Sequence, residues 1–260
     1  MSLSFQSICS SSSGNCVTLC SETTRVLIDC GLTSMKRTRQ AISYLHEEFP
    51  VSAVLLTHLH SDHISYYPLR VLEDCGLPLC LHEDSVDLLK EKHYNEYGFK
   101  NLQLRPYKNM PFCIGDFQIK PFEVVHNPYY ATFGFEICCQ DKKVVIATDF
   151  CEWENLLEHF VDADFIFVES NHDLALLKQY YNPNSRYHLP NPKTGELLAA
   201  AIADSKKPPQ AVMLGHISSQ RNTPRLAVRE TARTFEQIGR PMNFELSAAP
   251  LKDIGAVVRI

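Results

Sequence analysis

Three histidines and one aspartate fall within six consecutive residues, in the motif His-x-His-x-Asp-His at residues 58–63. Imidazole nitrogens and carboxylate oxygens are the ligands that zinc and similar divalent ions prefer in proteins. The motif follows an apolar run, residues 53–56, that predicts a buried strand. The spacing therefore predicts a metal site at the carboxyl end of a strand, rather than a chance group of core histidines.

Three more residues of ligand type stand where other apolar runs end. His126 follows the run at residues 117–125, Asp149 follows residues 144–148, and His216 follows residues 211–215. Singly, such a residue is usually only solvated, but the repeated arrangement predicts that the three meet the first motif. The candidate ligands are His58, His60, Asp62, His63, His126, Asp149 and His216. This set is too large for one tetrahedral zinc, so it favours two ions that share a carboxylate.

The elements that must position these residues are predicted from apolar runs and turn residues. Strands are expected over residues 3–9, 15–20, 25–29, 53–57, 78–82, 117–125, 133–139, 144–148, 165–168, 211–214, 243–247 and 255–259. Helices are expected from Thr33 to Pro50 and over residues 67–74, 84–93, 152–160, 174–181, 193–206 and 224–238. Thr33 is the expected N-cap of the first helix, and Thr223, Pro224 and Gly239 frame the last.

Strands this apolar need cover on both faces, which favours two mixed sheets packed face to face with helices outside. The predicted fold is α/β (α+β in some schemes), a four-layer αββα sandwich. No linker or charge block divides the chain, so one domain over residues 1–260 is expected.

Composition narrows the class of protein further. A net charge of −5 argues against a broadly basic surface, although it leaves room for a local basic patch. Ten cysteines without a C-x-x-C spacing, and a start without a leader-like segment, indicate reduced thiols in a cytoplasmic protein rather than disulfides or thiolate ligands. No apolar run approaches the roughly 18 residues of a membrane span, so no membrane association is expected.

The motif at residues 58–63 resembles the signature of the metallo-β-lactamase superfamily. The resemblance implies a metallo-β-lactamase fold in which His58, His60 and His126 hold one divalent ion. Asp62, His63 and His216 would hold a second ion, and Asp149 would bridge the two. Asp29, by itself a plain turn residue after a strand, is implied to orient the motif. Zinc is the ion expected at both positions, and the same ligands also permit manganese or iron.

Three further stretches are similar to the YycJ/WalJ-like group of this superfamily. They are Ser12-Ser13-Gly14-Asn15-Cys16, Glu169-Ser170-Asn171-His172-Asp173, and Gly215-His216-Ile217-Ser218 followed by Asn222-Thr223-Pro224. The resemblance implies a metal-dependent hydrolase of ester bonds, specifically a phosphodiesterase or nuclease, with 5′-exonuclease activity on double-stranded DNA proposed for the group. The nucleophile would be a hydroxide shared by the two ions and positioned by Asp62 and Asp149.

Glu169 and His188 are similar to a pair found in nuclease members such as tRNase Z. The resemblance implies that His188 protonates the leaving oxygen and that Glu169 orients it. The alternative for His188 is an ordinary loop histidine beside Pro190.

Nucleic-acid binding is less strongly indicated. Arg225, Arg229 and Arg233 recur every four residues on the last predicted helix, and Arg221 precedes it. Such a stripe can follow a phosphate backbone, but an ordinary solvated helix face fits equally well. DNA is the favoured substrate.

A small-molecule hydrolase acting on a thioester or cyclic phosphodiester is the alternative, and a non-catalytic metal-binding module is the third. Aromatic side chains narrowing the site would favour the small molecule; the candidates are Tyr66, Tyr67, Tyr129 and Tyr130. The sequence leaves the oligomeric state open.

Overall fold

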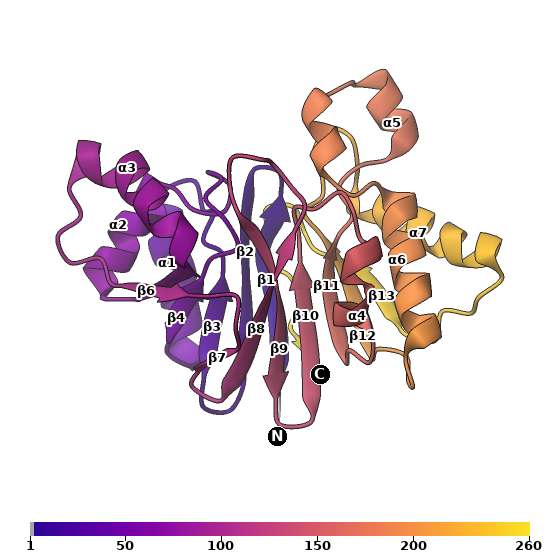
Figure 1. Cartoon of the computed structure of the whole chain (residues 1–260), viewed down its shortest axis with the longest axis horizontal. Helices are drawn as coiled ribbons and strands as arrows, with labels where there is room; N and C mark the ends of the chain where they lie inside the picture. Colours follow the sequence, from indigo (N-terminus) through magenta and orange to yellow (C-terminus); the bar gives the residue numbers. More distant parts are fainter. Residues whose placement is uncertain (1–2) are drawn as a thin grey trace.

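Two sheets packed face to face form the centre of the protein, and helices cover their outer surfaces (Figure 1). A computed structural model describes residues 3–260, with the side chains of residues 95–97 outside the description. The first sheet has the order β14-β1-β2-β3-β4-β5-β6, and the second has the order β13-β12-β11-β10-β9-β8-β7. This confirms the predicted αββα sandwich.

Most strands fall on the predicted runs, but β7 was not predicted, and the strand expected at residues 255–259 comprises only residues 258–259. The first sheet comprises β1 (Ser4–Ser11), β2 (Gly14–Cys20), β3 (Arg25–Ile28), β4 (Ala53–Leu55), β5 (Leu79–His82), β6 (Leu104–Tyr107) and β14 (Val258–Arg259). The second comprises β7 (Phe112–Ile114), β8 (Phe117–Val124), β9 (Thr132–Cys139), β10 (Lys142–Ala147), β11 (Phe165–Glu169), β12 (Ala211–Gly215) and β13 (Glu245–Ala248). The edge strand β6 was not predicted, because its sequence contains Pro106 and it exposes Arg105 and Pro106.

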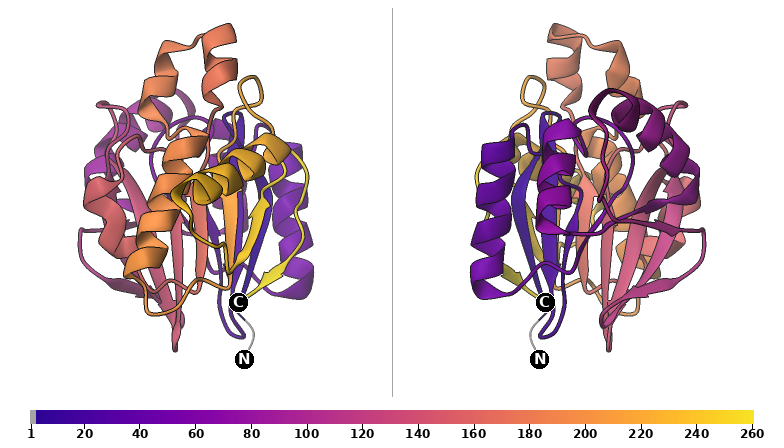
Figure 2. Two further views of the ribbon diagram at one scale, coloured as in Figure 1. Left: turned by 90° about the vertical axis from the view of Figure 1, so that its right-hand side faces the viewer. Right: turned by 90° about the vertical axis from the view of Figure 1, so that its left-hand side faces the viewer.

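Each sheet carries its own helices on its outer face (Figure 1). The first sheet is covered by α1 (Met35–Glu48), α2 (Tyr66–Cys75) and α3 (Val86–Tyr97). The second is covered by α4 (Leu157–Phe160), α6 (Asn191–Asp204) and α7 (Pro224–Ile238). Helix α5 (Leu174–Gln179) stands off one end of the sandwich, as both views of Figure 2 show.

Three apolar clusters fill the three spaces between the layers. Phe5, Phe117 and Phe165 lie in the cluster between the sheets. A second cluster joins α1 and α2 to the first sheet, and a third joins α6 and α7 to the second. Burying both faces of the strands accounts for their near-continuous apolar runs.

Most predicted helix ends are confirmed, and one cap is wrong. Thr223 Oγ1 accepts a hydrogen bond from Leu226 N at 3.1 Å, and Gly239 ends α7 at φ 72°. The first helix begins one residue later than predicted, because Ser34 rather than Thr33 accepts from Arg37 N. The predicted helix at residues 152–160 is a 3₁₀ turn at residues 154–156 followed by the short α4.

The parallel strands bring the residues that follow them to one end of the sandwich. Strands β3 to β6 run parallel, and so do β10 to β13. Parallel strands deliver the residues that follow them to the same edge, where α/β proteins place their sites. All ten cysteines are unpaired, and among the described residues no helix has the length and apolarity to cross a membrane.

Candidate metal centre

A first group of ligand-type atoms meets where the loop after β4 faces the end of β8. His58 Nε2 lies 2.7 Å from His60 Nδ1, and His126 Nε2 lies 3.3 Å from the same atom. Asp149 Oδ1 is 3.6 Å from His126 Nε2. Three imidazole nitrogens and a carboxylate oxygen therefore surround one point, as ligands of a single ion would.

A second group lies on the other side of Asp149. Asp62 Oδ2 lies 3.4 Å from His216 Nε2 and 3.7 Å from His63 Nε2. Asp149 reaches this group too, since its Oδ2 is 3.1 Å from His63 Nε2 and its Oδ1 is 3.6 Å from His216 Nε2. The carboxylate of Asp149 thus lies within reach of both groups.

Both groups have donor atoms that suit divalent ions. Within each set, the ligand atoms lie within 4.8 Å of one another. Asp149 is buried, and its Oδ2 accepts no well-aligned hydrogen bond from the described residues despite the nearby His63 Nε2. A buried carboxylate oxygen without a hydrogen bond is costly unless a cation satisfies it. The donor set therefore fits two ions with Asp149 between them. Among the described residues, the ligand groups contain no cysteine.

The protonation states of the first group favour metal binding. Burial lowers the pKa of His58 and of His126, and it lowers the pKa of His60 to about 4, with a further contribution from His126. These rings are consequently neutral near pH 7 and keep a lone pair for a metal.

The two histidines of the second group, His63 and His216, are surrounded by carboxylates. Burial by itself lowers the pKa of His63 and of His216. The Asp149 carboxylate and its neighbours outweigh it, raising the pKa of His63 well above its usual value and that of His216 to about 10. An ion that binds these two rings must displace their protons.

Hydrogen bonds hold the ring nitrogens that point away from the centre. Thr57 Oγ1 lies 3.0 Å from His58 Nδ1, and the carbonyl oxygen of Tyr187 lies 3.0 Å from His126 Nδ1. Asp29 Oδ2 lies 2.7 Å from His63 Nδ1, and Asp29 Oδ1 accepts from Thr57 N at 2.8 Å. Such contacts fix the orientation of a ligand ring and the nitrogen it presents to a metal.

Glu169 connects two histidines of the site. Its Oε1 lies 2.7 Å from His216 Nδ1 and 2.8 Å from His188 Nδ1. Its Oε2 accepts from the backbone N–H groups of Phe150 and Leu189, each at 3.1 Å. Burial raises the pKa of this carboxyl, but His188 and His216 outweigh burial and lower it to about 2, so it is an anion at neutral pH. The contact of Glu169 with His216 was not predicted from the sequence.

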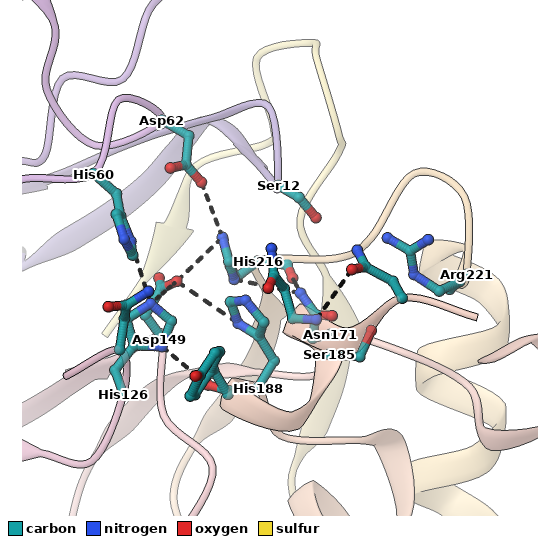
Figure 3. Close-up of a pocket in the computed structure, with 14 residues that line it drawn as sticks. Ser12, His60, Asp62, His126, Asp149, Asn171, Ser185, His188, His216 and Arg221 are labelled. Atoms are coloured by element: carbon teal, nitrogen blue, oxygen red, sulfur yellow. Dashed lines mark hydrogen bonds and ion pairs between the residues drawn. The ribbon is translucent and has the colours of Figure 1, made fainter. Parts of the chain in front are cut away.

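Figure 3 shows the resulting pocket, with His60, His126, Asp149 and His216 at one end and Arg221 at the other. Its volume is about 260 Å³, near the lower limit of pockets that hold small ligands. His188 lies between the two ends, and its Nδ1 faces Glu169. The ring nitrogen left to face the pocket is Nε2.

Comparison with known proteins identifies the family of the chain. A family model described as Beta-lactamase superfamily domain matches residues 24–217, which is more than half of the chain. The chain belongs to the metallo-β-lactamase superfamily.

Two relatives extend the similarity over nearly the whole chain. Exodeoxyribonuclease WalJ of Streptococcus pneumoniae is 26% identical over 276 aligned positions, covering 95% of this chain and 96% of that protein. Exodeoxyribonuclease YycJ of Bacillus anthracis is 25% identical, covering 92% of this chain and 91% of that protein.

Solved structures share the fold at lower identity. The metallo-β-lactamase fold protein YhfI from Bacillus subtilis superposes with a TM-score of 0.76 at 17% identity, and 100% of each chain is covered. A diphosphatase from the PhnP family gives a TM-score of 0.70 at 16% identity, covering 100% of this chain and 98% of the other.

Three site residues of this metallo-β-lactamase chain adopt left-handed backbone conformations. They are Asp29, Asp149 and His216, with φ of 59°, 61° and 48°. The conformation costs a non-glycine residue on the order of 1 kcal/mol, and such residues concentrate at functional sites. At His216, the backbone N–H donates to Ser10 Oγ at 2.7 Å and the carbonyl accepts from Asn171 Nδ2 at 2.9 Å. Asn171 belongs to one of the stretches singled out in the sequence, but neither its contact with His216 nor that of Ser10 was predicted.

Gly31 allows the metal loop to pack against the first strands. Gly31 N donates to the carbonyl oxygen of Asn15 at 2.7 Å, and Asn15 N donates to the carbonyl oxygen of Asp62 at 2.8 Å. A Cβ atom at Gly31 would lie 1.7 Å from that same Asp62 oxygen. The loop and Gly31 are therefore in contact through their backbones.

We expect Gly31→Ala to displace the loop at residues 58–63 and to lower the free energy of unfolding by about 1–3 kcal/mol, as overpacking does. Thermal unfolding and the metal content of the purified protein measure the two effects. Gly255→Ala is the control, because its added carbon meets nothing closer than 3.2 Å. Unchanged metal content in Gly31→Ala would show that the loop tolerates the displacement.

The four arginines predicted to contact nucleic acid lie in two different places. Arg221 lines the pocket, and its buried Nε has no hydrogen-bond partner among the described residues. Arg225, Arg229 and Arg233 lie on the exposed face of α7, outside the pocket lining. Arg229 and Arg233 also contact Glu230, at 3.2 and 3.7 Å, which offsets part of their charge.

The four tyrosines considered as walls of the site do not line the pocket; these are Tyr66, Tyr67, Tyr129 and Tyr130. Tyr130 instead contacts the His60 ring edge-on, with centroids 4.9 Å apart. Among the described residues, the wall opposite the metal groups is mainly polar and includes Asn182, Asn184 and Ser185.

Proposed function

We propose that this metallo-β-lactamase protein is a dinuclear metal-dependent phosphodiesterase that degrades DNA from strand ends. The observation that carries the proposal is a candidate proton donor, His188, held beside two groups of metal-ligand atoms in one pocket. Phosphodiester cleavage needs such a donor because an alkoxide is a poor leaving group. The relatives named exodeoxyribonucleases, which align with more than nine-tenths of the chain, support the same substrate.

The ligand assignment follows the two groups. His58, His60 and His126 would hold one ion. The second ion would be held by Asp62, His63 and His216. Asp149 would contact both. Two divalent ions at these positions would activate water and offset the charge that develops on the phosphate.

The remaining steps belong to side chains of the chain itself. His188 acts as an imidazolium: its Nδ1–H donates to Glu169, and it gives the Nε2 proton to the leaving oxygen, which leaves the ring as the neutral Nδ1–H tautomer. Arg221, at the other end of the pocket, contacts a phosphate of the bound strand through its guanidinium.

The size of the pocket supports action at a strand end. A volume of about 260 Å³ is at the small end for ligand sites, which favours entry of one strand end over entry of a whole duplex. The same observation favours a second candidate, a hydrolase of small phosphodiesters. A role for Arg225, Arg229 and Arg233 would require DNA to pass over α7.

The proposal is tested by comparing His60→Ala with His188→Ala. We expect His60→Ala to lose both metal and turnover. His188→Ala should keep its metal and lose about 100-fold or more in kcat, the usual contribution of a general acid. Metal analysis of each variant, with single-turnover rates on end-labelled duplex DNA, provides the two measurements.

A substrate panel separates the two candidates. The wild-type protein is assayed with zinc and with manganese on bis-p-nitrophenyl phosphate, a thioester and end-labelled DNA. Release of nucleotides from DNA ends supports the exonuclease, whereas turnover of the small phosphodiester alone supports the second candidate. Equal rates for wild type and His188→Ala on DNA would refute the role of His188.

A further inference from the structure

A second hollow lies directly against the metal pocket, on the outer side of His188. Its volume is about 270 Å³, and Asn182, Ser185 and His188 line both hollows. A strand whose phosphate lies in the metal pocket can therefore extend into the second hollow without leaving the protein surface.

The walls of this hollow have the chemistry of a nucleobase site. Tyr181 supplies an aromatic surface, Leu177, Pro183 and Pro190 supply aliphatic surfaces, and Arg186 adds a cation. Bases stack on aromatic side chains in proteins that bind single strands, because every base has a π face. The metal pocket beside it is lined mainly by polar and charged groups, with Tyr187 as an aromatic member.

The hollow is built on the segment at residues 173–188, which stands off the end of the sandwich (Figures 1 and 2). Hydrogen bonds close the base of this segment: Asn171 N donates to Leu189 O at 2.9 Å, and Asn191 N donates to His172 O at 3.0 Å. Asp173 N also donates to Arg221 O, at 2.8 Å. The segment is thus fixed to the same backbone that positions Glu169, His188 and Arg221.

Among the described residues, none covers the exposed apolar surface of this segment. Tyr181 exposes 78% of its surface, Tyr180 52% and Leu174 46%. Of these three residues, Tyr181 lines the hollow, so its exposed ring lies beside the metal pocket. Because the hollow adjoins the metal pocket and shares three lining residues with it, the substrate of that pocket is the occupant that the geometry favours.

We propose that the hollow lined by Tyr181, Arg186 and Pro190 binds one base of the DNA strand being degraded. The base stacks on the Tyr181 ring, and its sugar-phosphate backbone passes His188 into the metal pocket. This inference rests on the proposed function, and it adds a site that holds the end of the strand in register with His188.

The test removes the base from the substrate and the ring from the protein in turn. Three end-labelled DNA duplexes are compared. Each carries a single abasic residue, at the first, second or third position of the degraded strand. For wild type, we expect the abasic residue at one position to lower kcat/KM about tenfold, the size of one base-stacking contact. In Tyr181→Ala, the same abasic residue should have little further effect, because the interaction is already absent.

Two variants control the experiment. Tyr181→Phe keeps the ring and should keep the tenfold effect. Tyr180→Ala removes an adjacent, exposed tyrosine that does not line the hollow, and it should also keep the effect. An abasic effect that is the same size in Tyr181→Ala as in wild type, or no effect at any position, overturns the base site while DNA degradation still supports the nuclease. Hydrolysis of bis-p-nitrophenyl phosphate without any degradation of DNA overturns both proposals.

Discussion

Under the proposed function, Asp149→Asn is expected to lower DNA hydrolysis by roughly a thousandfold or more and to reduce the two proposed ions per chain to one or none. The carboxylate lies between the two ligand groups, 3.1 Å from His63 Nε2 and 3.6 Å from both His126 Nε2 and His216 Nε2. An amide provides one oxygen and no negative charge, so it cannot serve both groups.

Asparagine is the appropriate replacement because Asp149 has a φ of 61°. Asparagine tolerates this left-handed conformation better than alanine does, so the variant separates loss of charge from backbone strain. Metal analysis and single-turnover rates measure the outcome. Asp164→Asn is the control: this buried carboxylate accepts from Lys143 N at 2.9 Å, away from the ligand groups, and its replacement should leave metal content intact.

Glu169→Gln is expected to lower kcat/KM about 100-fold and to weaken metal binding about tenfold or more, as the loss of a supporting contact to a metal ligand does. The carboxylate accepts four hydrogen bonds: two from ring nitrogens, of His188 and His216, and two from the backbone N–H groups of Phe150 and Leu189. Glutamine has a single acceptor oxygen, so its NH₂ group must face donors. In either orientation of the amide, one pair of donors faces the NH₂ group, so the side chain shifts and no longer holds both His188 and His216 as the carboxylate does.

Glu136→Gln provides the matched control for this variant. Glu136 is also a largely buried carboxylate that contacts a histidine, with His159 Nδ1 at 2.5 Å, and it contacts Lys120 and Lys143 as well. Its replacement should lower stability and leave metal content and kcat/KM unchanged. If Glu169→Gln shows only the same loss of stability, then Glu169 supports the fold and has no role in positioning the two histidines.

The ligand types and the elements that carry them were predictable from the sequence. The motif at residues 58–63 and the apolar runs before His126, Asp149 and His216 are local patterns, and each run became a strand. The sandwich followed because runs that are apolar on both faces require cover on both sides. Edge strand β6 was missed because an exposed strand that contains proline has no apolar pattern.

Only the tertiary structure decided how these residues act on one another. Left-handed backbone at Asp29, Asp149 and His216, the shared contacts of Glu169, and the close approach of Gly31 to Asp62 depend on segments far apart in the chain. Contacts between distant segments also place Arg221 in the pocket, away from the arginines of α7, and place Tyr181 beside the metal pocket. Periodicity and spacing report which face of an element is buried, whereas the partner that meets that face is set by how the two sheets pack and where the loops between them turn.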